Sequence, residues 1–96
     1  MIRTFAYGQT EWVFGRELVA GLSPGLQRAA WKQLAILHAA GSLRDLRVPP
    51  GNHLEKLSGR REGRYSIRIN DQWRVCFAWR GGDAYEAEIV DYHRGR

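Results

Sequence analysis

The sequence is poor in several residue types, and each shortage excludes a class of protein. It contains a single cysteine, Cys76, so no disulfide can form within the chain. No apolar run approaches the roughly 20 residues that a membrane-spanning helix needs, and residues 1–7 lack the apolar region of a signal peptide. These absences predict a soluble protein of the reducing cytoplasm with no membrane partner.

Motifs of the common metal and phosphate sites are also missing. The three histidines, His38, His53 and His93, lie far apart, and one cysteine cannot complete a zinc site. No glycine-rich stretch is followed by the lysine and helix of a phosphate-binding loop, and no serine lies in a nucleophile elbow. The sequence therefore predicts neither a metal site nor a cofactor.

Basic residues, in contrast, are abundant and nearly all are arginine. The net charge is +5, and 13 of the 15 basic residues are arginine. Arginine binds phosphate through paired N–H groups and stacks on bases, so this bias favours a nucleic-acid partner. An arginine-biased genome is the alternative explanation of the composition. It does not explain why seven basic residues stand against three acidic ones between residues 53 and 80.

Residues 65–79 give the clearest structural signal, which is an antiparallel β-hairpin. Apolar side chains alternate along both halves, and only a turn with an odd number of residues keeps both apolar sets on one face. A turn at residues 70–72 places Arg68 directly opposite Arg74. Like charges opposed across a strand pair are destabilising. The pair therefore predicts a face that binds an anion, with phosphate as the obvious candidate.

The same alternation continues through a glycine turn into a last strand over residues 85–93. Its register pairs Trp79 with Tyr85 and Cys76 with Glu88. The face opposite the apolar one is then expected to be open and to carry polar side chains, which are Ser66, Arg68, Arg74, Glu88 and Tyr92. A solvated face on which the two arginines pair with Glu88 and Asp91 is the alternative interpretation.

One strand and two helices are predicted in the N-terminal half. Residues 2–7 alternate as a short strand, and Thr10 is expected to cap a first helix that ends at Gly21. Ser23 followed by proline starts a second helix, which ends at Gly41. The short connection between these helices predicts a helix hairpin.

The segment between the helices and the β-hairpin has three expected parts. Residues 43–52 are expected to be an extended connector ending in a turn, residues 54–57 a short strand and residues 58–63 a basic loop. The whole order predicts a single α+β domain over residues 1–96. In it, the N-terminal strand and the helix hairpin pack on one face of a twisted, mostly antiparallel sheet.

Metal-free phosphoryl transfer on RNA is the chemistry that these residues allow. It needs a base for the 2′-hydroxyl proton, cations for the developing phosphorane charge and an acid for the leaving oxygen. The candidate proton carriers are His53, Glu55, Asp91, Tyr92 and His93. The candidate cations and RNA-binding residues are His53, Lys56, Arg60, Arg61, Arg68 and Arg74.

Several candidates also have a structural alternative. Glu55 can form an ordinary ion pair, and Tyr92 can be a core aromatic residue at the end of a strand. Lys56 can serve solubility alone. Asp91 and His93 fall on the opposite parity from Tyr92, so a bulge or turn at the end of the strand must re-aim them if they are to reach the same face.

Three segments carry a family resemblance. They are residues 46–57 (LRVPPGNHLEKL), 65–74 (YSIRINDQWR) and 88–93 (EIVDYH). In this order they closely resemble HigB-type toxins, which belong to the RelE/ParE superfamily of bacterial toxin–antitoxin systems, and the likeness extends over essentially the whole chain. It implies the fold described above and a ribosome-dependent endonuclease that cleaves mRNA during translation. It also implies contact with ribosomal RNA and neutralisation by a helix-turn-helix antitoxin of the HigA type.

The resemblance also implies roles for individual residues. The active-site positions of the family match Arg74, Asp91, Tyr92 and His93, and basic residues of RelE relatives match Arg68 and the region of Lys56. The chain departs from the common pattern at His53, where the family string has arginine. It also departs at Glu55, near which the best-studied subgroup has a catalytic histidine. The general base stays open among Glu55, His53, Asp91 and His93.

Two other functions within the superfamily stay open. One is a ParE-like inhibitor of DNA gyrase that acts through protein binding, and the other is a non-catalytic relative that binds only its antitoxin. The Arg68–Arg74 pair and the intact Asp-Tyr-His end favour RNA cleavage over both.

Overall fold

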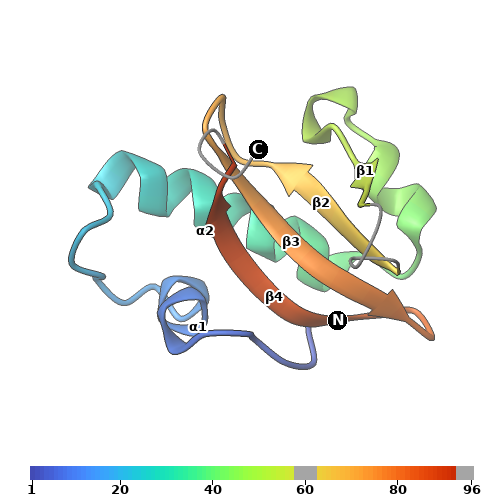
Figure 1. The fold of residues 1–96 in the computed structure, drawn as a ribbon, viewed down its shortest axis with the longest axis horizontal. Helices are drawn as coiled ribbons and strands as arrows, with labels where there is room; N and C mark the ends of the chain where they lie inside the picture. Colours follow the sequence, from blue (N-terminus) through green and yellow to red (C-terminus); the bar gives the residue numbers. More distant parts are fainter. Residues whose placement is uncertain (58–62, 93–96) are drawn as a thin grey trace.

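The computed structural model describes residues 1–57 and 63–92. Figure 1 shows how their elements are arranged. In chain order they are α1 (Gly8–Phe14), α2 (Pro24–Ala39), the 3₁₀ helices η1 (Leu43–Arg47) and η2 (Pro50–Asn52), β1 (Glu55–Lys56), β2 (Arg64–Arg68), β3 (Trp73–Arg80) and β4 (Asp83–Asp91). The strands form one antiparallel sheet in the order β1-β2-β3-β4. Both helices contact this sheet, with α2 crossing behind it in Figure 1, so the predicted α+β class is confirmed.

The second helix begins where the sequence predicts. Ser23 is extended and its hydroxyl accepts a hydrogen bond from the backbone N–H of Leu26 at 3.1 Å, and Pro24 occupies the first helical position. The buried stripe of α2 contains Ala30, Leu34 and Leu37. These side chains pack on the apolar face of the sheet and form the core with Ile67, Val75 and Phe77.

The first helix is shorter than predicted, and Thr10 does not cap it. α1 ends at Phe14, because Arg16 adopts a left-handed backbone with φ +65° and turns the chain away. Thr10 lies inside the helix and is buried, where its hydroxyl accepts a hydrogen bond from the Ile89 N–H at 3.1 Å. Residues 15–22 form a loop, and the Val19 N–H donates to the Gln27 side chain at 2.8 Å. Neither α1 nor α2 is long and apolar enough to cross a membrane, in the part of the chain that the structure describes.

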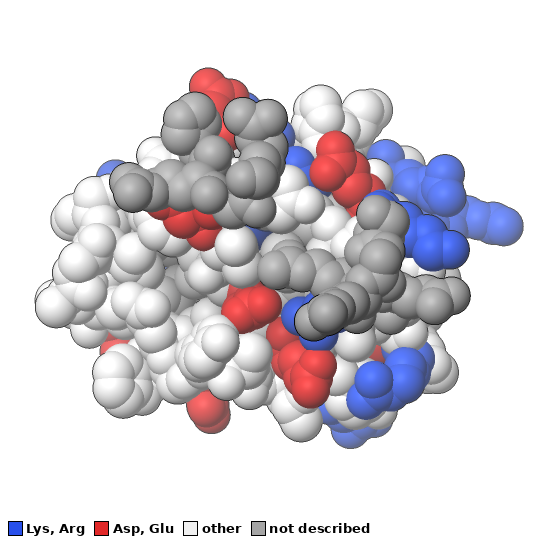
Figure 2. Space-filling view, viewed as in Figure 1, with Lys and Arg blue, Asp and Glu red and all other residues white. Residues whose placement is uncertain are grey.

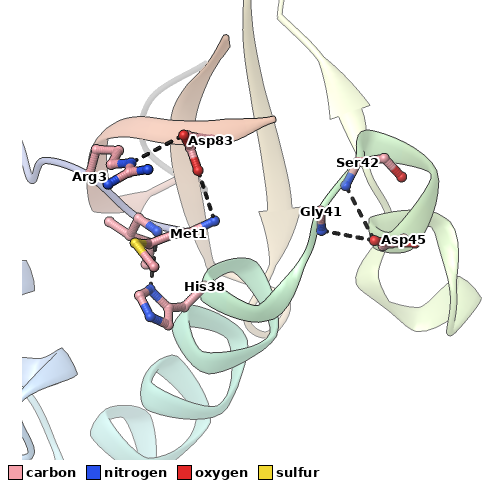
Figure 3. A network of polar contacts seen from close by, with 8 residues as sticks. Met1, Arg3, His38, Gly41, Ser42, Asp45 and Asp83 are labelled. Carbon is pink, nitrogen blue, oxygen red and sulfur yellow. Dashed lines mark hydrogen bonds and ion pairs between the residues drawn. The ribbon is translucent and has the colours of Figure 1, made fainter. Parts of the chain in front are cut away.

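The predicted N-terminal strand is reduced to two isolated parallel bridges to β4. Ile2 pairs with Ala84 and Phe5 with Ala87. Figure 3 shows how polar contacts fasten this segment: the α-amino group and Arg3 both bind the Asp83 carboxylate, at 3.3 and 3.1 Å. The Arg3 hydrogen bond, helped by the α-amino group, holds the pKa of the Asp83 carboxyl below its ordinary value.

The register of the β2–β3 hairpin is the predicted one, with Arg68 opposite Arg74. The pairing of Cys76 with Glu88 is also confirmed. The pairing of Trp79 with Tyr85 is wrong, because a bulge shifts the register and sets Trp79 opposite Ala84. In the bulge, Glu86 has a left-handed backbone with φ +54° and adds one residue to β4.

The connector before the sheet is helical where an extended chain was expected. Residues 43–47 and 50–52 form η1 and η2, and β1 then pairs with β2 as predicted. Ser42 and Asp45 form a capping box at the start of η1 (Figure 3), which explains why this short segment turns instead of extending. The segment lies beside β2, at the edge of the sheet that β1 forms, where it can reach the polar face.

Candidate functional site

Arg74 lies at the centre of the candidate site and is only 8% exposed. It stands near the start of β3, diagonal to Ser66 on β2. Its Nε donates to the Ser66 hydroxyl at 2.8 Å, and its Nη2 donates to the backbone carbonyl of Ser66 at 3.3 Å and to that of His53. Hydrogen bonds from two elements therefore fix the plane of the guanidinium. Its Nη1 has no acceptor among the described residues.

A carboxylate and a phenol border this guanidinium. An oxygen of Glu55 lies 3.8 Å from Arg74 Nη2, and the Glu55 side chain is 54% exposed. The Tyr92 ring centroid lies 5.5 Å from the guanidinium carbon, within reach of a cation–π contact. The backbone N–H of Tyr92 donates to the Gln72 carbonyl at 2.7 Å, which positions the residue after β4 has ended. A fixed cation, a solvent-accessible carboxylate and a phenol ring thus come together from β3, β1 and the end of β4.

Buried amides hold the His53 carbonyl in place. His53 has a left-handed backbone with φ +46°, directly after the buried Asn52. The Asn52 amide donates to the carbonyl of Leu46 at 3.2 Å and accepts from Gln33 Nε2 of α2 at 3.1 Å. Gln33 also donates to the carbonyl of Arg68 at 2.8 Å. One helix side chain thereby ties the turn before β1 to the end of β2.

Neither this amide pair nor the role of Ser66 was predicted from the sequence. Gln33 interrupts the apolar stripe of α2, which is the one signal that marks it as a buried polar residue with partners. Asn52 follows a Pro-Pro-Gly string that predicts only a turn. Ser66 was expected on the open face, and no local pattern indicates that it orients Arg74.

The expected open anion-binding face is wrong in part. Ser66 and Arg74 are buried, and each arginine of this face already has a carboxylate partner. Arg68 pairs with Asp71 at 2.5 Å, so the alternative pairing with Glu88 and Asp91 is wrong as well. Glu88 lies 3.6 Å from Arg64 instead. The opposed arginines are therefore tolerated partly because the protein supplies its own anions.

Figure 2 shows how charge is distributed over this side of the molecule. Acidic side chains lie in the middle of the view, and basic side chains gather toward its right-hand part, over the segment of η1, η2 and β1 and near the β3–β4 turn. The centre of the face is thus a mixed surface. Positive charge is concentrated at its border.

The other predicted site residues divide into three groups. Asp91 pairs with Trp73 on the opposite parity from Arg74, and its Oδ2 accepts from the Gln72 amide at 3.0 Å. Its Oδ1 is buried and has no hydrogen-bond partner among residues 1–57 and 63–92. Lys56 is registered with Tyr65 of the apolar face, so Glu55 and not Lys56 shares the face of Arg74. The remaining residues, Arg60, Arg61 and His93, lie outside the described residues.

Within residues 1–57 and 63–92 no group of histidine, cysteine, aspartate and glutamate side chains could hold a metal ion. The chemistry available to the described site is therefore that of an oriented guanidinium, a carboxylate and a phenol. This set suits proton transfer beside a developing negative charge.

Comparison with known proteins identifies the family. A family model described as the RelE-like toxin of the type II toxin–antitoxin system HigB matches residues 14–93. The chain belongs to this HigB-like toxin family. It is accordingly the toxin of a type II toxin–antitoxin system, and it has an antitoxin partner.

Individual relatives agree with this family. The chain is 46% identical over 69 residues to Toxin HigB-1 of Vibrio cholerae serotype O1, and the match covers 72% of either chain. It is 45% identical over 40 residues to Endoribonuclease HigB of Proteus vulgaris, a match that covers 42% of this chain and 44% of the relative. An uncharacterized protein of Haemophilus influenzae is 29% identical over 83 residues, which are 86% of this chain and 74% of that protein. The resemblance seen in the sequence is confirmed.

Proposed function

We propose that this toxin is a metal-independent endoribonuclease that cleaves mRNA on the ribosome and thereby stops translation. The observation that carries the proposal is the buried guanidinium of Arg74, fixed by Ser66 and His53, with Glu55 3.8 Å away. A cation held in one orientation stabilises a developing charge without reorganising during the reaction. The name of the Proteus vulgaris relative, Endoribonuclease HigB, supports the same activity.

The proposed reaction is an internal phosphoryl transfer. Glu55 takes the proton of the ribose 2′-hydroxyl, and the 2′-oxygen then forms a bond to the adjacent phosphorus. Arg74 stabilises the negative charge of the phosphorane through its Nη1, which faces no described acceptor. The bond from phosphorus to the 5′-oxygen breaks, and the Tyr92 hydroxyl gives that oxygen its proton. The products are a 2′,3′-cyclic phosphate and a 5′-hydroxyl end.

We assign Glu55 as the base because of its position. Of the four open candidates, it is the described side chain that lies beside Arg74 and is accessible to solvent. His53 contributes its backbone carbonyl to Arg74, and Asp91 is hydrogen-bonded to Gln72. His93 lies outside the described residues, and we propose that it assists proton transfer at the end of the motif, as the family pattern implies.

RNA binding is proposed for the surrounding cations. Arg68 holds Asp71, whose side chain is 99% exposed, and such surface pairs contribute only about 0–1 kcal/mol. An RNA phosphate therefore displaces Asp71 at little cost. Lys56, Arg60 and Arg61 are proposed to contact the mRNA or rRNA backbone at the border of the site. The antitoxin is proposed to be a helix-turn-helix protein, and the ribosomal target places the toxin in the cytoplasm.

Translation in vitro tests the cleavage proposal. The message is mapped by primer extension after incubation with wild-type toxin, Arg74→Ala and Arg80→Ala. Arg80 is an exposed arginine at the far end of β3, so it matches the charge change outside the site. We expect cleavage with wild type and Arg80→Ala and intact message with Arg74→Ala. Intact message with the wild-type toxin at a toxic dose, together with blocked DNA supercoiling, would show that the protein is a gyrase inhibitor instead.

A further inference from the structure

A groove lies away from the Arg74 site, between the end of α1 and the first half of α2. Its volume is about 510 Å³. Apolar side chains that line it include Val13, Leu18 and Trp31, and the cations that line it are Arg16, Arg28 and Lys32. No carboxylate lines it among the described residues. None of these side chains has a role in the proposed RNA cleavage.

The walls of the groove are held in place by specific contacts. The Gln27 side chain accepts from the Val19 N–H at 2.8 Å and donates to the Glu17 carbonyl at 3.3 Å, so the loop after α1 is fastened to α2. The Trp31 indole donates to the Phe14 carbonyl at 3.1 Å. Arg16 has φ +65°, and its guanidinium lies 4.0 Å above the Trp31 ring. A groove formed in advance loses little conformational entropy when it binds a partner.

One large apolar side chain of the groove is strongly exposed. Leu18, which lines it, is 89% exposed. Together with the half-buried Trp31 and the buried Val13, it gives the groove an apolar surface that a partner can cover.

We propose that this groove binds an acidic, amphipathic segment of the antitoxin. Apolar side chains of that segment fill the floor between Val13 and Leu18, and its carboxylates pair with the cations of the rim, Arg16, Arg28 and Lys32. This is the arrangement of an apolar centre with a polar rim that protein interfaces use. The inference depends on membership of the toxin family, which supplies the partner, and not on RNA cleavage.

Charge and shape disfavour the other occupants. Nucleic acid would use the cations but not the apolar floor, and Arg16 already occupies one face of the Trp31 ring, where a base would have to displace it in order to stack. A second copy of this chain carries a net charge of +5, which opposes its approach to three cations. A negatively charged protein segment with apolar side chains is the partner that complements both the apolar floor and the basic rim of the groove.

The surface is separate from the cleavage site. α1 and α2 pack together and against the apolar side of the sheet (Figure 1). Arg74 lies on the polar side, where its Nε donates to Ser66. Changes in the groove are therefore expected to alter antitoxin binding without altering the groups around Arg74. This separation allows the two proposals to be tested independently.

Calorimetry with the purified toxin and its cognate antitoxin tests the proposal. The groove variants are Leu18→Glu and Arg28→Glu, and both side chains are exposed, so the fold tolerates them. Val48→Glu and Arg44→Glu repeat the same chemical changes at exposed positions outside the groove. We expect each groove variant to weaken binding by on the order of tenfold or more, and each control to leave it unchanged. Circular dichroism confirms that all four variants are folded.

Three further readings complete the experiment. Raising the salt concentration should weaken wild-type binding more than binding of Arg28→Glu, because one ionic contact is already lost in the variant. Arg74→Ala should bind the antitoxin as wild type does, even if the toxin proves not to cleave mRNA. Groove variants that bind as tightly as the controls would overturn the proposal. So would groove variants that keep full antitoxin affinity but no longer cleave mRNA, since the groove would then face the ribosome.

Discussion

Replacement of Asn52 by alanine tests whether buried amides hold the candidate site together. Asn52 is 3% exposed, and its side chain makes three hydrogen bonds. It accepts from the Gln33 amide, donates to the part-buried Val48 carbonyl at 3.4 Å and donates to the buried Leu46 carbonyl. The substitution leaves that carbonyl and one Gln33 N–H buried without a partner. Each such orphaned group costs about 1–3 kcal/mol. We therefore expect Asn52→Ala to lower the free energy of unfolding by about 2–6 kcal/mol.

The matched control is Asn70→Ala in the β2–β3 turn. The Asn70 side chain is likewise hydrogen-bonded, accepting from the backbone N–H groups of Gln72 and Trp73 at 2.8 and 2.9 Å, but it is exposed. Water replaces the lost acceptor there, so the expected loss is about 1 kcal/mol or less. Urea denaturation followed by circular dichroism measures both losses. The slope of the transition should not change, because the folded states remain equally compact.

A double-mutant cycle isolates the amide pair itself. Gln33→Ala and Asn52→Ala each remove the same contact, so the double variant should lose less stability than the sum of the two single losses. A coupling of about 0.5–3 kcal/mol is the range for residues in one hydrogen-bond network. The pair would have no special role if the two losses simply added, or if Asn52→Ala were no more destabilising than Asn70→Ala.

Three other predictions concern the site and the N-terminal fastening. Glu55→Gln should reduce mRNA cleavage by roughly 10²–10⁴-fold with unchanged melting, and an active variant would exclude Glu55 as the base. Ser66→Ala removes the acceptor of Arg74 Nε, so the rate of mRNA cleavage should fall. Single-turnover titrations should show that the affinity for RNA is preserved. A loss of affinity with an unchanged cleavage rate would contradict an orienting role for Ser66. Asp83→Asn should lower the melting temperature at neutral pH and not in acid. The lowered pKa of Asp83 means that its contacts stabilise the fold above the ordinary carboxyl value of 3.8 and lose this effect as the pH falls through the folded-state pKa. Equal wild-type and variant melting at neutral pH would show that the Arg3–Asp83 contact contributes nothing.

Local patterns predicted the parts of the fold that depend on local rules. The parity of the apolar residues and a three-residue turn were enough to place Arg68 opposite Arg74, since a slip by one residue would expose the whole apolar face. Ser23 and Pro24 marked the start of α2 because capping and the fixed proline φ act within one turn. The family resemblance of the C-terminal segments was equally visible.

Long-range contacts decided what the sequence analysis did not find. Leu18 has the spacing of a core residue of a first helix, yet it is 89% exposed, because the chain leaves the helix at Arg16. The burial of Arg74 depends on a carbonyl at His53, 21 residues away, that amides hold in place. Neither the backbone turn at Arg16 nor the aim of that carbonyl has a signature in the neighbouring residues.

The bulge at Glu86 has a consequence for how the chain tolerates insertions and deletions. Ala78 pairs with Tyr85 on one side of the bulge and Cys76 with Glu88 on the other, so one residue of β3, Phe77, lies opposite two of β4, Glu86 and Ala87. Glu86, with its left-handed backbone, is the extra residue of this bulge. A chain without it would keep the same partners at both ends of β4, and every side chain around Arg74 would stay on its face. The loss of one residue between Glu88 and the end of the strand would instead exchange the two faces, and Tyr92 would leave the site.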